Sequence, residues 1–168
     1  VDLTLFRRWY SQSGTPVLTV RDSYDAQKQQ YTLTVSQMTP PTADQAEKQV
    51  LHIPLDIELY NQQGEVIPLR SQGQPVSNVL NVVREEQQFI FDDVAQQPIP
   101  SLLREFSAPV KLDYPFTDEQ LSFLMKHARN AFSRWDAAQS LLGRYIKENV
   151  SCVQKGQPLI LPEMVIDA

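Results

Sequence analysis

The sequence contains little of what nucleotide-binding, disulfide-stabilised or membrane-spanning proteins require. Cys152 is the one cysteine among 168 residues, so no disulfide can form within the chain. A lone thiol also suits a reducing compartment. Only five glycines are present, and none forms a phosphate-binding glycine loop. No apolar run approaches the roughly 20 residues that a membrane-spanning helix needs. We therefore expect a domain held together by an apolar core.

Positive charge is also scarce. The chain has 15 Lys and Arg against 20 Asp and Glu, which gives a net charge of −5. Such a surface repels phosphate backbones, and Arg7-Arg8 is the one tight basic pair. Nucleic acid is therefore not expected as a partner. The 42% hydrophobic and 21% charged residues are typical of a folded globular protein.

Residues with catalytic or metal-binding chemistry do not converge in the sequence. His52 and His127 lie in different halves, and neither has a second ligand three or four residues away. Cys152 is predicted to lie in a linker after a helix, without a histidine to activate it. The paired carboxylates are interpreted as solvated turns and a helix N-terminus; they are Glu85-Glu86, Asp92-Asp93 and Asp118-Glu119. We predict no catalytic, metal-binding or cofactor-binding residue in this chain.

Apolar residues alternate with polar ones from about residue 16 to residue 112. Tyr31, Leu33 and Val35 are one such run, and Ile53 to Leu59 form another. This period of two indicates strands with one buried face, which is typical of antiparallel sheets. Strands are predicted at 17–21, 30–37, 53–60, 65–69, 79–83, 87–91, 102–106 and 110–113. Their number and spacing predict an immunoglobulin-like antiparallel β-sandwich.

Turn residues connect these strands. Asn61 to Gly64 predicts a hairpin between 53–60 and 65–69. Residues 39–49 carry a proline pair and no periodicity, so we expect a solvated loop that crosses between the sheets. Pro54 lacks a backbone donor, which predicts an edge or a bulge at that position.

The pattern becomes helical after about Pro115. Thr117 to Gln120 form a capping box, followed by Leu121, Leu124, Met125 and Ala128 at helical spacing. A second helix is predicted from near Ser133 to Asn149, and a third is expected to open at Pro162. The second helix carries an apolar stripe of Trp135, Ala138, Leu142, Tyr145 and Ile146. We therefore predict a mainly β chain with a sandwich domain at 1–115, followed by two or three α-helices at 116–168 that open a truncated helical domain.

Two aromatic and basic clusters are candidates for docking onto neighbouring domains. Rigid aromatic rings bury a large area and lose little entropy on docking. The candidate docking residues are Arg8, Trp9, Tyr10, Asn130, Phe132, Arg134 and Trp135.

Three stretches together carry a family resemblance. Residues 7–16 read RRWYSQSGTP, residues 102–112 read LLREFSAPVKL, and residues 130–139 read NAFSRWDAAQ. In this order and at these separations they resemble the bacterial-type aminopeptidase N (alanyl aminopeptidase) family of zinc metallopeptidases. The intervening stretch HIPLDIELYNQQGEVIPL is similar to the sandwich domain of that family.

The resemblance implies a place within a longer enzyme. Family members combine a β-saddle, a thermolysin-like catalytic domain, a small β-sandwich and a C-terminal helical domain. This chain would be the third part and the opening of the fourth, which agrees with a sequence that begins at Val1 without a Met. The zinc-binding and catalytic motifs would lie upstream, so no catalytic residue is carried over to this chain. The parent would be cytoplasmic and would remove N-terminal amino acids from peptides with a zinc-activated water.

The partners implied are the catalytic and helical domains of the same parent chain, and peptides would be substrates of the parent alone. Two alternative functions fit the sequence less well. A free-standing immunoglobulin-like binding module would explain the sandwich but not the helical part, and it would need an exposed aromatic platform. An intrinsic hydrolase would need a catalytic constellation that the sequence lacks.

Overall fold

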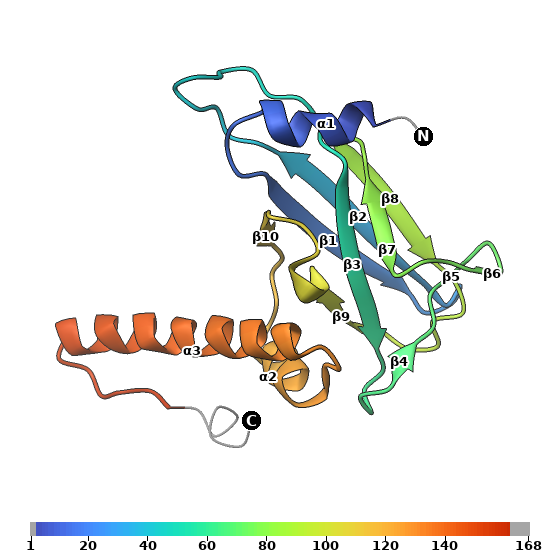
Figure 1. Ribbon diagram of the computed structural model, residues 1–168. Coiled ribbons are helices and arrows are strands. Elements are labelled where there is room, and N and C mark those ends of the chain that lie inside the picture. Colours follow the sequence, from blue (N-terminus) through green and yellow to red (C-terminus); the bar gives the residue numbers. More distant parts are fainter. Residues whose placement is uncertain (1–2, 162–168) are drawn as a thin grey trace. The chain divides into compact units, whose positions relative to one another are not determined.

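Alternating apolar residues in the first part of the chain form the strands of two sheets. In the computed structural model, which describes residues 3–161, helix α1 (Thr4–Ser11) precedes these sheets (Figure 1). The strands are β1 (Val17–Asp25), β2 (Gln30–Met38), β3 (Ile53–Tyr60), β4 (Val66–Ile67), β5 (Arg70–Ser71), β6 (Gln74–Pro75), β7 (Val79–Val82), β8 (Glu86–Phe91), β9 (Ile99–Leu102) and β10 (Lys111–Asp113). A 3-10 turn, η1 (Arg104–Phe106), follows β9, and helices α2 (Asp118–His127) and α3 (Ala131–Gln154) come last.

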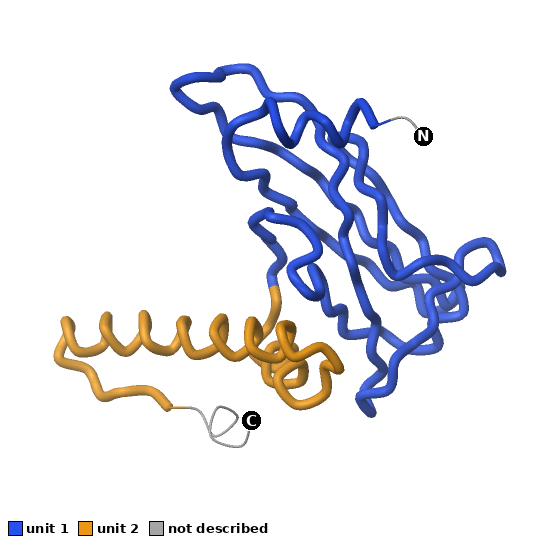
Figure 2. The backbone as a smooth tube through the Cα atoms, viewed as in Figure 1, with its two compact units in different colours: residues 1–115 blue, residues 116–168 orange. Residues whose placement is uncertain are grey.

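The described chain divides into two compact units, residues 1–115 and residues 116–168 (Figure 2). In the first unit, one sheet has the strand order β10-β1-β2-β8. The other is built around β3, which pairs with β7 through residues 53–56, with β9 through residues 57–60, and with β4 at Leu59 and Tyr60. These pairs are antiparallel, and so are β1–β2 and β2–β8, whereas β1–β10 is parallel. The predicted mainly β fold with antiparallel sheets is confirmed.

The core of the first unit comes from the inward positions of both sheets. Leu18, Val20, Tyr31, Leu33 and Val35 of the first sheet are 0% exposed. Every second residue of β3 is buried to the same extent; these residues are Ile53, Leu55, Ile57 and Leu59. The period of two in the sequence therefore identified the buried face correctly. The predicted hairpin is also present, since Leu59 pairs with Ile67 and Tyr60 with Val66.

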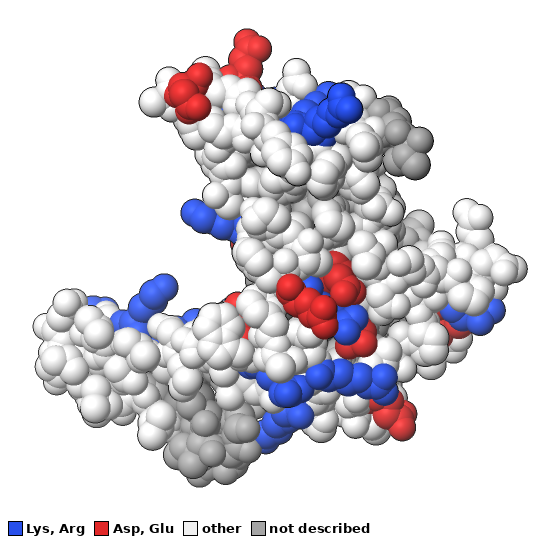
Figure 3. All heavy atoms as spheres, viewed as in Figure 1, with Lys and Arg blue, Asp and Glu red and all other residues white. Residues whose placement is uncertain are grey.

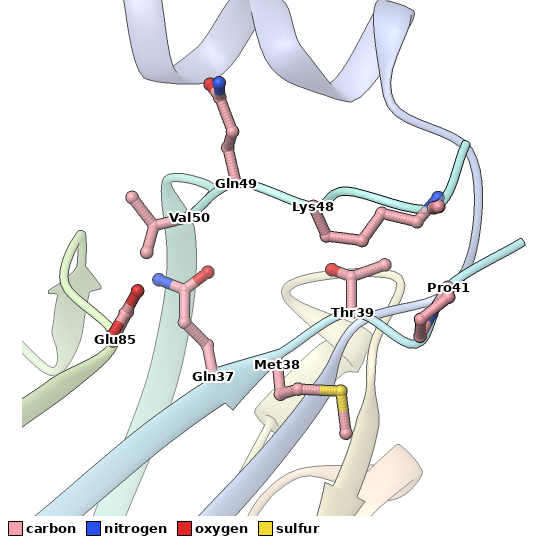
Figure 4. A pocket seen from close by; sticks show the side chains of 9 residues that line it. Gln37, Met38, Thr39, Pro41, Lys48, Gln49, Val50 and Glu85 are labelled. Atoms are coloured by element: carbon pink, nitrogen blue, oxygen red, sulfur yellow. The ribbon is translucent and has the colours of Figure 1, made fainter.

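A buried amide joins the two sheets at one end. Gln37, in β2, is 8% exposed and donates from Nε2 to the carbonyl of Leu51 at 2.9 Å and to that of Arg84 at 3.1 Å. Its Oε1 accepts the backbone N–H of Leu51 at 2.8 Å. Figure 4 shows this side chain rising from the end of β2 between Val50 and Glu85. The Gln37 amide therefore replaces a backbone ladder where the chain crosses from one sheet to the other.

Several predicted element bounds are wrong. The strand expected at 102–106 ends at Leu102, and η1 follows because Leu103, Glu105 and Phe106 have φ of 55°, 53° and 53°. No strand continues through such left-handed backbone. Helix α1 and the short β5–β6 pair are present although neither was predicted. Of the strand expected at 65–69, only Val66–Ile67 forms.

The second unit contains α2 and α3, which contact each other. The predicted capping box is present: Gln120 N–H donates to Thr117 Oγ1 at 3.2 Å, and Thr117 N–H donates to Gln120 Oε1 at 3.0 Å. Leu121 and Leu124 of α2 are buried, as are Ala137 and Leu141 of α3.

Helix α3 differs from its prediction in two respects. It continues to Gln154 rather than ending by Asn149, because no proline or glycine interrupts it after Gly143 until Gly156, at φ 67°. Cys152 therefore lies inside the helix and is buried, not in a linker. The predicted apolar stripe is largely exposed, with Trp135, Leu142 and Ile146 at 57%, 41% and 64%. The third helix expected at Pro162 lies outside the described residues.

A carboxylate at the start of α2 links the two helices. Asp118 accepts hydrogen bonds from the Tyr145 hydroxyl at 2.5 Å and from Arg144 at 2.7 Å. The Tyr145 hydrogen bond, with Arg144, lowers the pKa of Asp118 below its ordinary value. The same bond to Asp118 raises the pKa of Tyr145 to about 12. The ionised carboxylate and the neutral phenol are therefore the forms that this contact favours.

We predict that Gln37→Met, which keeps the length of the side chain, lowers the free energy of unfolding by about 2–4 kcal/mol, because the backbone groups at Leu51 and Arg84 lose their partners. Gln88→Met is the matched control, since Gln88 is an exposed residue of the same sheet with one 3.4 Å hydrogen bond to Thr34. The control is expected to change stability by less than about 0.5 kcal/mol. Urea unfolding followed by circular dichroism measures both. Equal effects would show that the Gln37 amide does not join the sheets.

The Asp118 contact predicts a pH dependence with two arms. Because folding lowers the pKa of Asp118, its carboxylate stabilises the fold at pH values above the unfolded pKa. This stabilisation is lost as the pH falls through the folded pKa. A raised pKa at Tyr145 contributes stability below its ordinary 10.0, and this is lost as pH rises toward 12. Asp118→Asn should remove most of the loss of stability at both low and high pH. Thermal unfolding of the helices, followed by circular dichroism at 222 nm over a range of pH, measures this. Glu119→Gln changes a neighbour in the same first turn and should keep the pH dependence of the wild type. If this control lost the pH dependence instead, the assignment to Asp118 would be refuted.

Candidate functional site

Helix α1 is tied to the sandwich through polar side chains. Arg8 donates to the Val50 carbonyl at 2.6 Å, and the Trp9 indole N–H donates to the His52 carbonyl at 2.8 Å. Gln12 both donates to and accepts from the backbone of Gln49, at 3.0 and 2.8 Å. Figure 1 shows α1 beside the segment that leads into β3. Arg8 and Trp9 of α1, together with Gln12 at its C-terminal cap, therefore hold the chain just before β3.

The predicted docking residues of α1 divide into two kinds. Arg8 and Trp9 use their polar groups within the first unit, as their bonds to Val50 and His52 show. Tyr10 is 84% exposed and meets Phe6 edge-on, with the ring centroids 6.2 Å apart. Tyr10 is therefore the member of the group that presents apolar area outward.

An apolar hollow opens beside these rings. Its volume is about 270 Å³, and the lining residues are Phe6, Trp9, Tyr10, Pro54, Ser107, Ala108 and Pro109. The lining thus combines α1, the start of β3 and the turn after η1. Trp9 and Tyr10 of this lining are predicted docking residues, whereas Phe6, Pro54 and Pro109 are not, because no local pattern shows that these segments meet.

A charged cluster lies further along β3, near η1. Arg104 contacts Asp56 at 3.2 Å and Glu58 at 3.4 Å, and Glu58 accepts the Tyr60 hydroxyl at 2.5 Å. Burial raises the pKa of Asp56 above its ordinary value despite the neighbouring Arg104. Figure 3 shows acidic atoms gathered round basic atoms near η1. Sequence reasoning missed this cluster because Arg104 was assigned to a strand.

The candidate residues of the second unit organise the turn between its helices. Asn130 accepts the Ser133 N–H at 3.0 Å and so caps α3. Arg134 donates to the carbonyls of Ala128 and Arg129 at 2.7 and 3.0 Å. Phe132 and Trp135 place their ring centroids 5.8 Å apart. Asn130 and Arg134 therefore use their polar groups within the second unit, whereas Trp135 is mostly exposed.

The exposed apolar stripe of α3 continues toward its C-terminal end. Ile146, Val150, Val153 and Leu159 line a second hollow of about 400 Å³, together with Asn149 and Gln154. Asn149 holds the returning chain by donating to the Ile160 carbonyl at 2.8 Å and accepting its N–H at 2.6 Å. This unit therefore presents a long apolar face.

Residues 3–161 contain no group of three or more His, Cys, Asp or Glu side chains that could hold a metal ion. His52 Nε2 lies 2.7 Å from Asn81 Oδ1, and the His127 ring lies 4.6 Å from that of Phe123. Within the same range, no helix has the length and apolar character needed to cross a membrane.

Comparison with protein families matches each unit separately. Residues 14–115 match the family described as a domain of unknown function (DUF3458) with an Ig-like fold. The chain belongs to this family. Residues 118–168 match the companion family DUF3458_C, described as ARM repeats. The immunoglobulin-like character predicted for the sandwich is thereby confirmed.

Several similar proteins bear the name of the family that the three sequence stretches resemble. Aminopeptidase N of Escherichia coli K12 is 66% identical over 168 residues, which are 100% of this chain and 19% of that protein. Aminopeptidase N of Haemophilus influenzae is 52% identical over 98% of this chain and 19% of its own length. The resemblance is confirmed along the whole chain, which spans about a fifth of these relatives.

A solved structure agrees with these sequence matches. Legionella pneumophila aminopeptidase A, crystallised in complex with aspartic acid, superposes with a TM-score of 0.77 at 30% identity. The match covers 98% of this chain and 17% of that one. The similarity thus extends over both units of the chain, but over a small part of the larger protein.

The contacts of α1 predict opposite results for its two neighbouring aromatics. Trp9→Ala removes the hydrogen bond to His52 and buried ring area, so the free energy of unfolding should fall by about 2 kcal/mol. Tyr10→Ala should change it by less than about 0.5 kcal/mol, since that ring is exposed. Urea unfolding followed by far-ultraviolet circular dichroism measures both. A similar loss in the two variants would show that α1 is not anchored as described.

Proposed function

We propose that this chain is a non-catalytic supporting segment of a longer zinc aminopeptidase, in which it places the catalytic domain against the helical domain. The observation that carries this proposal is the extent of the match. Similarity to aminopeptidase N runs over 100% of this chain but only 19% of the relative. A segment that small, with an Ig-like part and an ARM-repeat part, suits a spacer between larger bodies.

The proposed parent removes single N-terminal amino acids from peptides and is cytoplasmic. Zinc, held by residues elsewhere in the parent, activates the attacking water. The two histidines described above face an asparagine and a phenylalanine in different units, which does not suit them as ligands of one ion. Under this proposal, peptides bind elsewhere in the parent, and the chain described here sets the relative placement of its domains.

The helical unit is proposed as the opening of a domain built from stacked helices. A helical repeat buries its apolar face on the next repeat and is not stable with that face in water. The face of α3 that carries Trp135, Leu142, Ile146, Val150 and Val153 fits such a neighbour, because these side chains are 41–65% exposed. The downstream helices of the parent are the proposed partners of this face, and Trp135 is its first anchor.

A paired assay tests the proposal. The purified chain and the full-length parent are each analysed for zinc and for hydrolysis of alanine-p-nitroanilide. We expect stoichiometric zinc and turnover in the parent, and neither in the chain alone. Zinc or turnover in the chain alone would contradict a supporting role. In the parent, Trp135→Ala is expected to lower thermal stability and alter the preference for peptide length, whereas Trp135→Phe should preserve much of both; unchanged values for the alanine variant would also contradict it.

A further inference from the structure

The ammonium group of Lys48 lies among oxygen atoms from two segments of the chain. Its Nζ donates to the Ser13 carbonyl at 2.7 Å and to the Thr42 hydroxyl at 2.8 Å. It also donates to Ser13 Oγ at 3.1 Å and to Gln45 Oε1 at 3.3 Å. An ammonium has three N–H donors and no acceptor, so these oxygens suffice for all of its donors. We call the oxygens of Ser13, Thr42 and Gln45 the oxygen cage.

Bonds that do not involve the lysine also hold the oxygen cage together. Thr42 and Gln45 form an isolated bridge, in which each backbone N–H donates to the carbonyl of the other, at 3.0 and 3.1 Å. Ser13 N–H donates to Gln45 Oε1 at 3.0 Å, and the hydroxyls of Ser13 and Thr42 lie 2.7 Å apart. Gly14 has a φ of 95°, and a Cβ there would lie 3.2 Å from the methyl carbons of Thr39 and Thr42. The two segments therefore meet closely and keep their oxygens near one point.

The chemistry of the oxygen cage suits an ammonium better than a divalent metal ion. Its oxygens belong to a backbone carbonyl, two hydroxyls and a side-chain amide, all of them neutral. They lie 2.7–3.3 Å from Nζ, whereas Ca²⁺ and Mg²⁺ need oxygens at about 2.3–2.6 Å and about 2.0–2.1 Å. Among residues 3–161, Lys48 has no carboxylate oxygen within 4.0 Å. Asp44 instead accepts the Ser13 hydroxyl at 3.1 Å, one hydrogen bond away from the cation.

A hollow leads along the stem of Lys48 to the oxygen cage. Its volume is about 370 Å³, and apolar side chains of Met38, Ala46 and Val50 are part of its lining, together with Lys48 itself. Figure 4 shows the Lys48 stem running along this hollow toward Pro41. Truncation of Lys48 would therefore open a path from the hollow to the oxygens, wide enough for a small free amine.

The oxygen cage fastens the middle of the β2–β3 loop, residues 39–52. Gln12 binds the backbone of Gln49, and Arg8 binds the Val50 carbonyl, so the later part of the loop is held by α1 and its cap. Lys48 extends this contact to Ser13 and Thr42. Without a cation, the part-buried oxygens of the cage lose their donor, which costs free energy. Order in this loop therefore depends on the cation.

We infer that Ser13, Thr42 and Gln45 form a binding site for a primary ammonium group, and that Lys48 of the same chain is its resident ligand. In a variant that lacks this side chain, the site takes a free alkylammonium ion from solution. The inference goes beyond the proposed supporting role and does not depend on it, because its readout is the order of the β2–β3 loop rather than catalysis or domain placement.

Hydrogen–deuterium exchange of the full-length parent, measured by mass spectrometry, tests the inference. Lys48→Ala should raise amide exchange at residues 42–49 about tenfold, because the loop opens more often. The ion n-propylammonium corresponds to the part of the side chain removed, and at about 0.1 M it should restore exchange to near the wild-type rate. Tetramethylammonium at the same concentration carries the charge but no N–H donor and should restore nothing. Unchanged exchange in Lys48→Ala, no restoration by n-propylammonium, or equal restoration by both ions would each overturn the inference.

A second variant separates the charge of Lys48 from the packing of its stem. Lys48→Met keeps an apolar stem and removes the ammonium, so it should raise exchange at residues 42–49 as the alanine variant does. It should not respond to n-propylammonium, because the methionine fills the path. Lys111→Ala removes an exposed lysine of β10 and should leave these residues unchanged. Wild-type exchange in Lys48→Met would show that packing of the stem orders the loop, and the inference would be wrong.

The oxygen ligands are tested in the Lys48→Ala background. Adding Thr42→Val removes one cage hydroxyl at nearly constant shape, so the concentration of n-propylammonium that restores half of the protection should rise at least threefold. Thr34→Val makes the same change at a half-buried residue of β2 and should leave this concentration unchanged. An equal requirement for n-propylammonium in the two double variants would overturn the assignment of the oxygen cage as its binding site.

Discussion

The burial of β3 against the first sheet is the interaction on which the rest of the first unit depends. Five of its side chains are completely buried, and each of the four aliphatic ones contributes about 1.5–3 kcal/mol relative to exposure. The same strand pairs with β4, β7 and β9, so it also fixes their positions. Because successive side chains alternate, burial of the inner face determines the direction of Pro54, Asp56 and Glu58 on the outer face. The apolar core and the charged cluster with Arg104 thus lie on opposite sides of one strand.

Side-chain amides stabilise the irregular backbone around this core. Gln37 binds the N–H and the carbonyl of Leu51, and Gln12 does the same at Gln49. Gln87 in β8 accepts the Val83 N–H and donates to the Asn81 carbonyl, both at 3.2 Å. Asn149 repeats the arrangement with Ile160 in the second unit. A side-chain amide has N–H donors and a carbonyl acceptor, as a peptide group does, so it completes hydrogen bonding where strands or helices stop.

The two units present different surfaces to their surroundings. The first unit has a small apolar hollow beside α1 and, further along β3, the carboxylates of Asp56 and Glu58 against Arg104. The α3 face is long and apolar, as expected for a helix that stacks on further helices. Both surfaces support the proposed role of the chain, which is to fix the relative placement of larger bodies.

The sequence by itself determined the features that depend on local pattern. Alternation at residues 31–35 and 53–59 identified the buried faces, and Thr117 with Gln120 identified the start of α2. The three family stretches identified the relatives. Only the tertiary structure decided the rest: Trp9 bonds to His52, 43 positions away, and Arg104 reaches Asp56, 48 positions away. The left-handed backbone after Leu102 was likewise not predictable from residue spacing. Residue spacing encodes period and caps, whereas these contacts arise only when distant segments pack together.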